Sequence, residues 1–285
     1  MAGSDASSAS LPLHFPRHYV PLPNQCSGDD FVLAVIEGHL SDEEKPRYTG
    51  KGCIGFSEKL PSEVIYYPEF SRAGMRFPLP LPFSELCRGL GIHPLMLTAN
   101  GFRFFAGFHV LCSEHGWRPT FTVFRCFYQL QMNKQGFFLF KRRFPALVDV
   151  EGRVVSWRAG LKLVQCKDDS AGWKKKWFCV QNNFVDWAVC QKGYEGKGKF
   201  PSDPSPNLEE LGSSELSTLW AIHEATKASD WSPLDGDEVS EEQLRKAGLS
   251  RRLNRPPVKW VMLTLSLVPV VSCRISVCRF VGDSD

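Results

Sequence analysis

Phenylalanine is concentrated between positions 102 and 144, and this stretch determines where a core can form. The chain has 285 residues and 21 phenylalanines. Because large aromatic side chains bury the most apolar surface, they dominate the energetics of a core. We therefore expect the core to be centred on this stretch. The length allows one domain of about 150–200 residues with flanks, or two small domains.

Apolar spacing predicts two buried helices within this stretch. Residues on one face of the first helix recur at helical steps: Phe102, Phe105, His109 and Cys112. We expect Asn100 to cap this helix and Gly116 to end it. Thr120 then caps a second helix, whose apolar face runs from Phe121 to Leu130. A helix that is apolar around so much of its circumference is typically buried.

The spacing changes after position 136 to short runs rich in β-branched and aromatic residues, which are typical of strands. These runs are 137–140, 148–150, 154–157 and 177–180. We expect an α+β fold, in which the Phe-rich helices pack on a small antiparallel sheet.

Shorter signals place elements before the core. Ser27 and Asp30 form a capping box that opens a helix over 31–39. Prolines alternate with apolar residues over 77–82 and predict an extended arm, because proline removes amide donors. A helix over 83–90, ended by Gly91, follows the arm.

The composition along the chain indicates five segments. They are a disordered N-terminus over 1–26, a globular domain over 27–191, a linker over 192–207, an acidic helical segment over 208–249 and a tail over 250–285. In the acidic segment we expect a helix over 215–225 and another capped by Ser240. The tail holds an apolar run that is too short to span a membrane. It is an edge strand, a frayed end or a gene-model artefact.

Charge is distributed unevenly along the chain. Between positions 98 and 180 there are 14 lysines and arginines against 5 acidic residues, whereas between 201 and 249 there are 3 against 11. This asymmetry allows three interpretations: a polyanion partner for the basic body, docking of the acidic segment onto the body, or two solvated surfaces of opposite sign.

The cysteines indicate the compartment. The chain has 10 cysteines, without any Cys-x-x-Cys pair, and several lie among apolar residues. Buried, reduced cysteines have this pattern, and disulfides would require an oxidising compartment. The first ten residues lack the apolar core of a signal peptide. We expect a nuclear or cytoplasmic protein that is not secreted.

Two basic clusters are candidates for contact with nucleic acid. The first is Lys141, Arg142 and Arg143, and the second is Lys174, Lys175 and Lys176, with Trp173 and Trp177 on either side. Lysine and arginine neutralise phosphates, and aromatic rings stack on unpaired bases. The alternative is that the rings face the core and the lysines form the turn before a strand, or a nuclear-import signal.

No catalytic or metal-binding pattern is present in the sequence. His109, Cys112 and His115 recur at three-residue steps, but a structural zinc site takes ligands from a second element, so core packing is the better interpretation. Phosphate loops, nucleophile elbows and zinc knuckles are missing, and carboxylates are scarce in the basic body. We predict that the protein is not an enzyme, has no cofactor or metal and has no small-molecule or membrane partner.

Several short motifs resemble a plant family of gypsy-type transposon (transposase-like) domains. They are Ala73–Leu79, Leu95–Phe102, Ala106–Cys112, 124–130 and 173–180, and together they span roughly residues 60–190. Ala99 stands where the family has proline. The resemblance implies a retrotransposon origin and supplies no catalytic residues. Because members are often longer, it also implies a truncated copy.

Two functions are compatible with these observations. The first is a non-catalytic, gag-like module of a transposable element that binds element RNA or DNA or associates with itself. The second is a domesticated host protein that recruits protein partners through the acidic segment. The second function would leave Leu216, Leu219 and Ile222 facing solvent.

Overall fold

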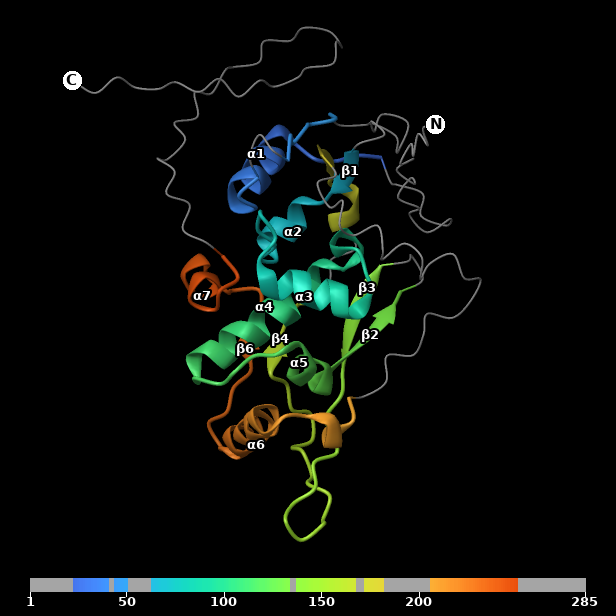
Figure 1. The fold of residues 1–285 in the computed structure, drawn as a ribbon. Helices are drawn as coiled ribbons and strands as arrows, with labels where there is room; N and C mark the ends of the chain where they lie inside the picture. Colours follow the sequence, from blue (N-terminus) through green and yellow to red (C-terminus); the bar gives the residue numbers. More distant parts are fainter. Residues whose placement is uncertain are drawn as a thin grey trace, which may run out of the picture.

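The computed structural model describes residues 23–40, 44–50, 63–133, 137–167, 172–181 and 206–250 (Figure 1). Most of the predicted N-terminal segment and linker, and nearly all of the predicted tail, lie outside these residues.

Helices and short strands alternate along the described chain. In order they are α1 (Gly28–Glu37), β1 (Glu63–Tyr66), α2 (Pro68–Arg72), α3 (Leu81–Leu90), η2 (Pro94–Met96), α4 (Ala99–Glu114), α5 (Phe121–Phe127), β2 (Tyr128–Met132), β3 (Phe138–Arg142), β4 (Val164–Gln165), η3 (Trp173–Lys175), β5 (Phe178–Gln181), η5 (Leu208–Glu210), α6 (Ser213–Lys227), β6 (Leu234–Asp235) and α7 (Glu241–Lys246). The predicted α+β class is confirmed, and the acidic segment is helical as expected.

The strands form three separate pairs in the described part of the chain, where the sequence predicted one small sheet. β1 pairs antiparallel with β5, β2 pairs antiparallel with β3, and β4 pairs parallel with β6. Of the expected strands over 148–150 and 154–157, a single bridge between Val148 and Val154 is formed. Among the described residues, no strand belongs to two of these pairs, so the pairs do not join into one sheet.

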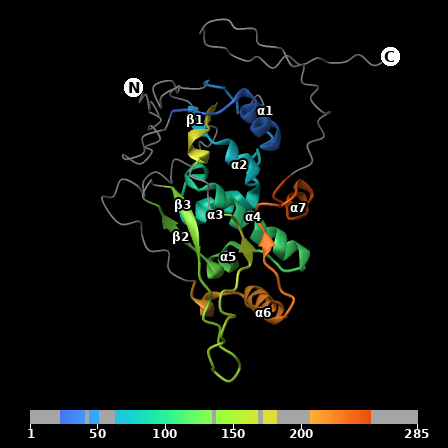
Figure 2. The same ribbon diagram turned by 180° about the vertical axis from the view of Figure 1, so that it is seen from behind.

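Helix α4 lies at the centre of the molecule, with the strand pairs and the other helices around it (Figures 1 and 2). Phe102, Phe105 and Phe108 are all buried and contact aromatic rings of the neighbouring helices α3 and α5. The ring of Phe102 lies 5.5 Å from that of Phe83 in α3, and the ring of Phe105 lies 5.1 Å from that of Phe124 in α5. The predicted position of the core is therefore confirmed.

The predicted helices are present, but several of their ends differ. Helix α1 covers 28–37 rather than 31–39, and α6 covers 213–227 rather than 215–225. Helix α3 begins at Leu81, within the predicted extended arm, because proline is tolerated in the first turn of a helix.

Thr98, not Asn100, caps α4, since its Oγ1 accepts a hydrogen bond from the Gly101 amide at 3.1 Å. The second helix ends at Phe127 rather than near Leu130, because the next residues pair with β3. These residues fit a strand and a helix equally well, and the partner strand decides between them.

The acidic segment is packed against the rest of the fold. Leu219 and Ile222 of α6 are fully buried, and α6 contacts α5. Asp237, which follows β6, forms a 2.9 Å ion pair with the buried Arg103 of α4. At these contacts the acidic segment docks onto the basic body, which was one of the three interpretations of the uneven charge. Since Leu219 and Ile222 are buried, the apolar face of α6 is not open to a partner.

Candidate nucleic-acid interface

Lys174, Lys175 and Lys176 lie in and directly after η3, the turn that leads into β5. Trp173 and Trp177 are buried, with exposed fractions of 5% and 1%. The ring of Trp173 packs edge-on against Tyr67 at 4.8 Å. Neither tryptophan presents a ring face to a base in this structure, so the prediction for this cluster rests on its lysines.

Two of these lysines interact within the molecule. The Nζ of Lys174 lies 5.3 Å from the ring centroid of Phe137, within the range of a cation–π interaction. The Nζ of Lys176 lies 3.0 Å from Asp30 Oδ1 in the first turn of α1. Partial burial disfavours the charged form of Asp30, but hydrogen bonds from Ser27 and Lys176 outweigh it and lower its pKa to about 2. The charge of Lys176 is therefore largely balanced.

Lys141, Arg142 and Arg143 lie at and just beyond the C-terminal end of β3. Lys141 and Arg142 are exposed. The Nη1 of Arg142 donates a 3.0 Å hydrogen bond to the Leu161 carbonyl, and the Nε of Arg143 donates a 2.7 Å bond to the Arg125 carbonyl. The carbonyl partner of Arg142 fixes its guanidinium group without neutralising the charge, so this group stays available to an anion.

The two predicted clusters lie at opposite ends of β3. Lys174 sits against Phe137, which directly precedes the strand, whereas Lys141 and Arg142 are its last residues. Five residue steps of extended chain separate Phe137 from Arg142, or roughly 17 Å. The sequence therefore suggested two clusters that do not form one surface.

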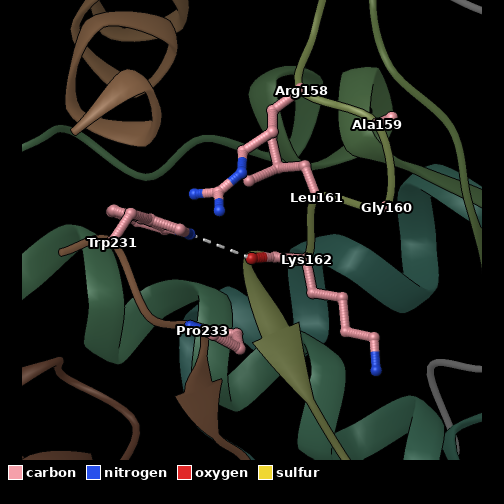
Figure 3. Close-up of a pocket in the computed structure, with 7 residues that line it drawn as sticks. All are labelled: Arg158, Ala159, Gly160, Leu161, Lys162, Trp231 and Pro233. Atoms are coloured by element: carbon pink, nitrogen blue, oxygen red, sulfur yellow. Dashed lines mark hydrogen bonds between the residues drawn. The ribbon is translucent and has the colours of Figure 1, made fainter. Parts of the chain in front are cut away.

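A pocket adjoins the cluster at the end of β3, because Arg142 is bonded to one of the residues that line it. The pocket has a volume of about 260 Å³ and is lined by Arg158, Ala159, Gly160, Leu161, Lys162, Trp231 and Pro233 (Figure 3). The guanidinium of Arg158 extends toward Trp231, whose Nε1 donates a 3.2 Å hydrogen bond to the Lys162 carbonyl. Gly160 makes the turn possible with a φ of +73°.

Aromatic side chains continue the surface beyond the pocket. The exposed ring of His115 stacks on Trp117 at 4.3 Å, with an interplanar angle of 10°, and lies 6.0 Å from the ring of Trp231. The guanidinium of Arg158 thus lies near these aromatic rings, whereas the side chain of Lys162 points away from Trp231 (Figure 3). We name the six residues at the centre of this region the β3-end surface: Lys141, Arg142, Arg143, Arg158, Lys162 and Trp231.

Sequence analysis missed half of the β3-end surface. Arg158 and Lys162 flank a glycine turn without a basic run, and Trp231 lies 69 positions after Lys162. They meet because β4 pairs with β6, and the amide of Leu234 donates a 3.0 Å bond to the Leu163 carbonyl. Nothing in the sequence near Trp231 indicated that pairing.

The His109 and Cys112 side chains are part of the core, as predicted. His109 is 5% exposed, and burial lowers its pKa to about 4. Cys112 is fully buried, and burial raises the pKa of its thiol. His115, by contrast, is on the surface. Within the described ranges, no three His, Cys, Asp or Glu side chains group as a metal site would require.

A comparison with protein families gives a match to the centre of the fold. Residues 64–132 match the model of a family described as putative gypsy type transposon. This segment is similar to the gypsy-type transposon family. The match supports a transposable-element origin, over a shorter range than the resemblance suggested. Comparisons with curated proteins and with solved structures found no match.

The gypsy-type segment covers the centre of the fold but none of the β3-end surface. It extends from β1 through α4 and α5 to the end of β2. All six residues of the β3-end surface follow it in the chain. In the described ranges, no helix is both long and apolar enough to cross a membrane.

Proposed function

We propose that the chain is a non-catalytic, transposable-element-derived protein, a gag-like structural module that associates with element RNA or DNA. The gypsy-type match supports the origin. The β3-end surface supports the association, and the hydrogen bond from Arg142 to Leu161 is the observation that carries it. This bond joins the basic end of β3 to the pocket that holds Arg158 and Trp231.

The chemistry of the surface suits a single strand. Cationic side chains neutralise phosphates, and a partly exposed indole stacks on an unpaired base of any kind. The pocket is smaller than the roughly 300–1,000 Å³ typical of small-molecule sites. It therefore fits contact with one splayed base at the surface better than enclosure of a substrate.

The proposed role places the protein in the nucleus or the cytoplasm. The six described cysteines are present as thiols, five of them buried. Thiols persist in reducing compartments, where element RNA and DNA are also found.

The experiment is a binding titration of the full chain with labelled single-stranded RNA, single-stranded DNA and duplex DNA across a salt series. The test variant is Arg158→Gln with Lys162→Gln, which removes two charges from the β3-end surface. The matched control is Lys174→Gln with Lys175→Gln, which removes two charges at the other end of β3. Glutamine keeps most of each aliphatic stem, so the packing changes little.

We expect R158Q/K162Q to weaken binding at least ten-fold and to make the slope of log affinity against log salt shallower by about 1–2, whereas K174Q/K175Q changes both far less. Trp231→Leu should weaken single-strand binding by about five-fold or more and duplex binding much less, since only unpaired bases stack. If the two double variants weakened binding equally, the β3-end surface would not be the nucleic-acid site. Absence of binding at low salt would refute the proposed association.

A further inference from the structure

A hairpin of nine residues projects from the body next to α6. Its strands are held by two backbone hydrogen bonds, from the Asp149 amide to the Arg153 carbonyl at 2.9 Å and from the Val155 amide to the Leu147 carbonyl at 2.7 Å. Both ribbon views show this yellow-green segment extending beyond α5 and α6 (Figures 1 and 2). We name residues 147–155 the arm.

The base of the arm is fixed by aromatic packing. Phe144 and Trp157 stack at 5.5 Å, and the Trp157 Nε1 donates a 2.8 Å hydrogen bond to the Pro145 carbonyl. The same indole packs edge-on against Phe127 of α5 and against His223 of α6. A base clamped by rings from two helices holds the arm in one direction, so its tip is presented in a defined way.

Three valines of the arm are exposed. Val148, Val150 and Val154 have exposed fractions of 50%, 103% and 70%. The hairpin bonds are made by residues on either side of the Val148–Val154 bridge, so the amides and carbonyls of these two valines point to the outer edges. Open edges with β-branched side chains are templates for pairing with another strand.

The shape of the tip does not depend on these valines. Asp149 Oδ1 accepts hydrogen bonds from the amides of Glu151 and Arg153, both at 2.9 Å, and Gly152 takes a φ of +79°. A carboxylate and a glycine therefore form the turn. The exposed valines contribute little to the arm's own stability.

We propose that the arm pairs with the arm of a second copy of this chain. The charges of the tip favour that occupant. Arg153 forms ion pairs with Asp149 at 2.8 Å and with Glu151 at 2.7 Å, so both signs lie side by side. A two-fold axis presents the same patch from both copies, and a patch carrying both signs is complementary to itself. Arg153 of each copy then pairs with Glu151 of the other, while the open edges join as an antiparallel sheet.

This inference rests on the proposed gag-like role for its biological meaning, because a structural module has to assemble. Nucleic acid has no part in the contact. The test is therefore made on nuclease-treated full chain washed at high salt, which separates self-association from association bridged by nucleic acid.

Sedimentation velocity over a concentration series, from about 1 to 100 μM, measures the dimer. We expect the native chain to dimerise and the variant Val150→Lys with Val154→Lys to dissociate with a Kd at least ten-fold higher. Both valines are exposed, so the variant keeps its fold, which a circular dichroism spectrum verifies. Val32→Lys, at an exposed valine of α1, is the matched control and should leave the Kd unchanged.

Charge exchange identifies the second copy as the occupant. Arg153→Glu and Glu151→Arg should each weaken the dimer, and an equimolar mixture of the two variants should restore it. A native chain that sediments as a monomer throughout would overturn the proposal, as would a V150K/V154K variant that dimerises normally. Dimers seen only before nuclease treatment would also overturn it. The nucleic-acid binding titrations with R158Q/K162Q test the proposed function, and their result does not depend on whether the chain dimerises.

Discussion

Arg76 and Glu241 stand 165 positions apart in the chain, and both Nε and Nη2 of the arginine donate hydrogen bonds to Glu241 Oε2, at 2.9 and 2.8 Å. The arginine is nearly buried, and its Nη1 donates to the Ser71 carbonyl at 2.6 Å. Arg76 belongs to the gypsy-type segment, whereas Glu241 is the first residue of α7. The pair therefore attaches the C-terminal helix to the matched part of the fold.

Replacing Glu241 with Ala should lower the free energy of unfolding by about 1–2 kcal/mol, because it leaves a largely buried guanidinium with carbonyl partners alone. The half-exposed carboxylate keeps the loss below that of a fully buried pair. Urea denaturation of the full chain measures this change. Glu242→Ala is the control: its carboxylate pairs with Arg245 on the surface, and the expected loss is about 0.5 kcal/mol or less. Equal losses in the two variants would show that the Arg76 contact contributes no more than the surface pair.

Gly107 of α4 faces Val164 of β4 at close range. A methyl group on this glycine would lie 2.7 Å from Val164 Cγ1, which is too close for two carbons. Gly→Ala inside a helix normally stabilises by about 1 kcal/mol. Here we expect the opposite sign, a loss of about 1–3 kcal/mol from overpacking, measured as a lower thermal midpoint.

The same contact predicts a rescue. In a Val164→Ala background the space opposite Gly107 is open, so Gly107→Ala should destabilise much less than it does alone. This coupling between the two positions is measured by a double-mutant cycle. Additive effects of the two substitutions would show that the clash with Val164 is not the cause.

The free energy of unfolding should decrease as the pH is lowered, because of the buried His109. Burial lowers its pKa from 6.5 to about 4. The unfolded chain binds this proton as pH falls below about 6.5, whereas the folded chain stays unprotonated until about pH 4, so stability is full above 6.5 and is lost between these values. A shift of this size corresponds to about 3 kcal/mol at pH 4.

His109→Phe removes the titrating group while keeping a ring beside Phe105, which lies 4.4 Å away. The free energy of unfolding of this variant should fall less between pH 6.5 and 4 than that of the native chain. His93 contributes in the same direction, since burial also lowers its pKa to about 4. Both chains retain His93, so the difference between the two curves isolates His109. If the free energies of unfolding of the two chains changed with pH in parallel, His109 would have the same pKa in the folded and unfolded states.

Thiol reactivity should separate Cys166 from the buried cysteines. Cys166 is partly exposed, whereas Cys112 and Cys126 are buried. Burial raises the pKa of Cys126 to about 11 and also raises that of Cys112, so little thiolate forms at pH 8. Brief iodoacetamide treatment of the native protein, followed by peptide mass spectrometry, should label Cys166 before the five buried cysteines of the described residues. Rapid labelling of Cys112 before unfolding would contradict the burial described here.

Helix starts could be predicted from the sequence where the capping residues lie next to the helix. Ser240 and Gln243 form the expected capping box of α7, and Thr120 caps α5. Asn100 and Thr98 are both good caps by residue type. Thr98 becomes the cap because of a contact that is distant in the sequence. Its amide donates a 2.7 Å hydrogen bond to the Phe138 carbonyl, which holds Thr98 in an extended conformation.

The candidate surface was less predictable because it depends on strand pairs between distant residues. Basic runs drew attention to Lys174–Lys176, yet the flanking tryptophans are buried and Lys176 faces Asp30. Arg158 and Trp231 carry no local signal and meet only after β6 has paired with β4. Single-residue patterns therefore located the core well and the surface poorly.

The pairing of β1 with β5 has a consequence during protein synthesis. Val64 pairs with Val180, so the ribosome must add more than a hundred residues before β1 meets its partner. At about 5–20 residues per second this takes on the order of 10 s. During that interval Ile65 and Tyr66, which are fully covered in the finished fold, are open to other nascent chains and to chaperones. Slower translation across this stretch therefore lengthens the time for which these two side chains are uncovered.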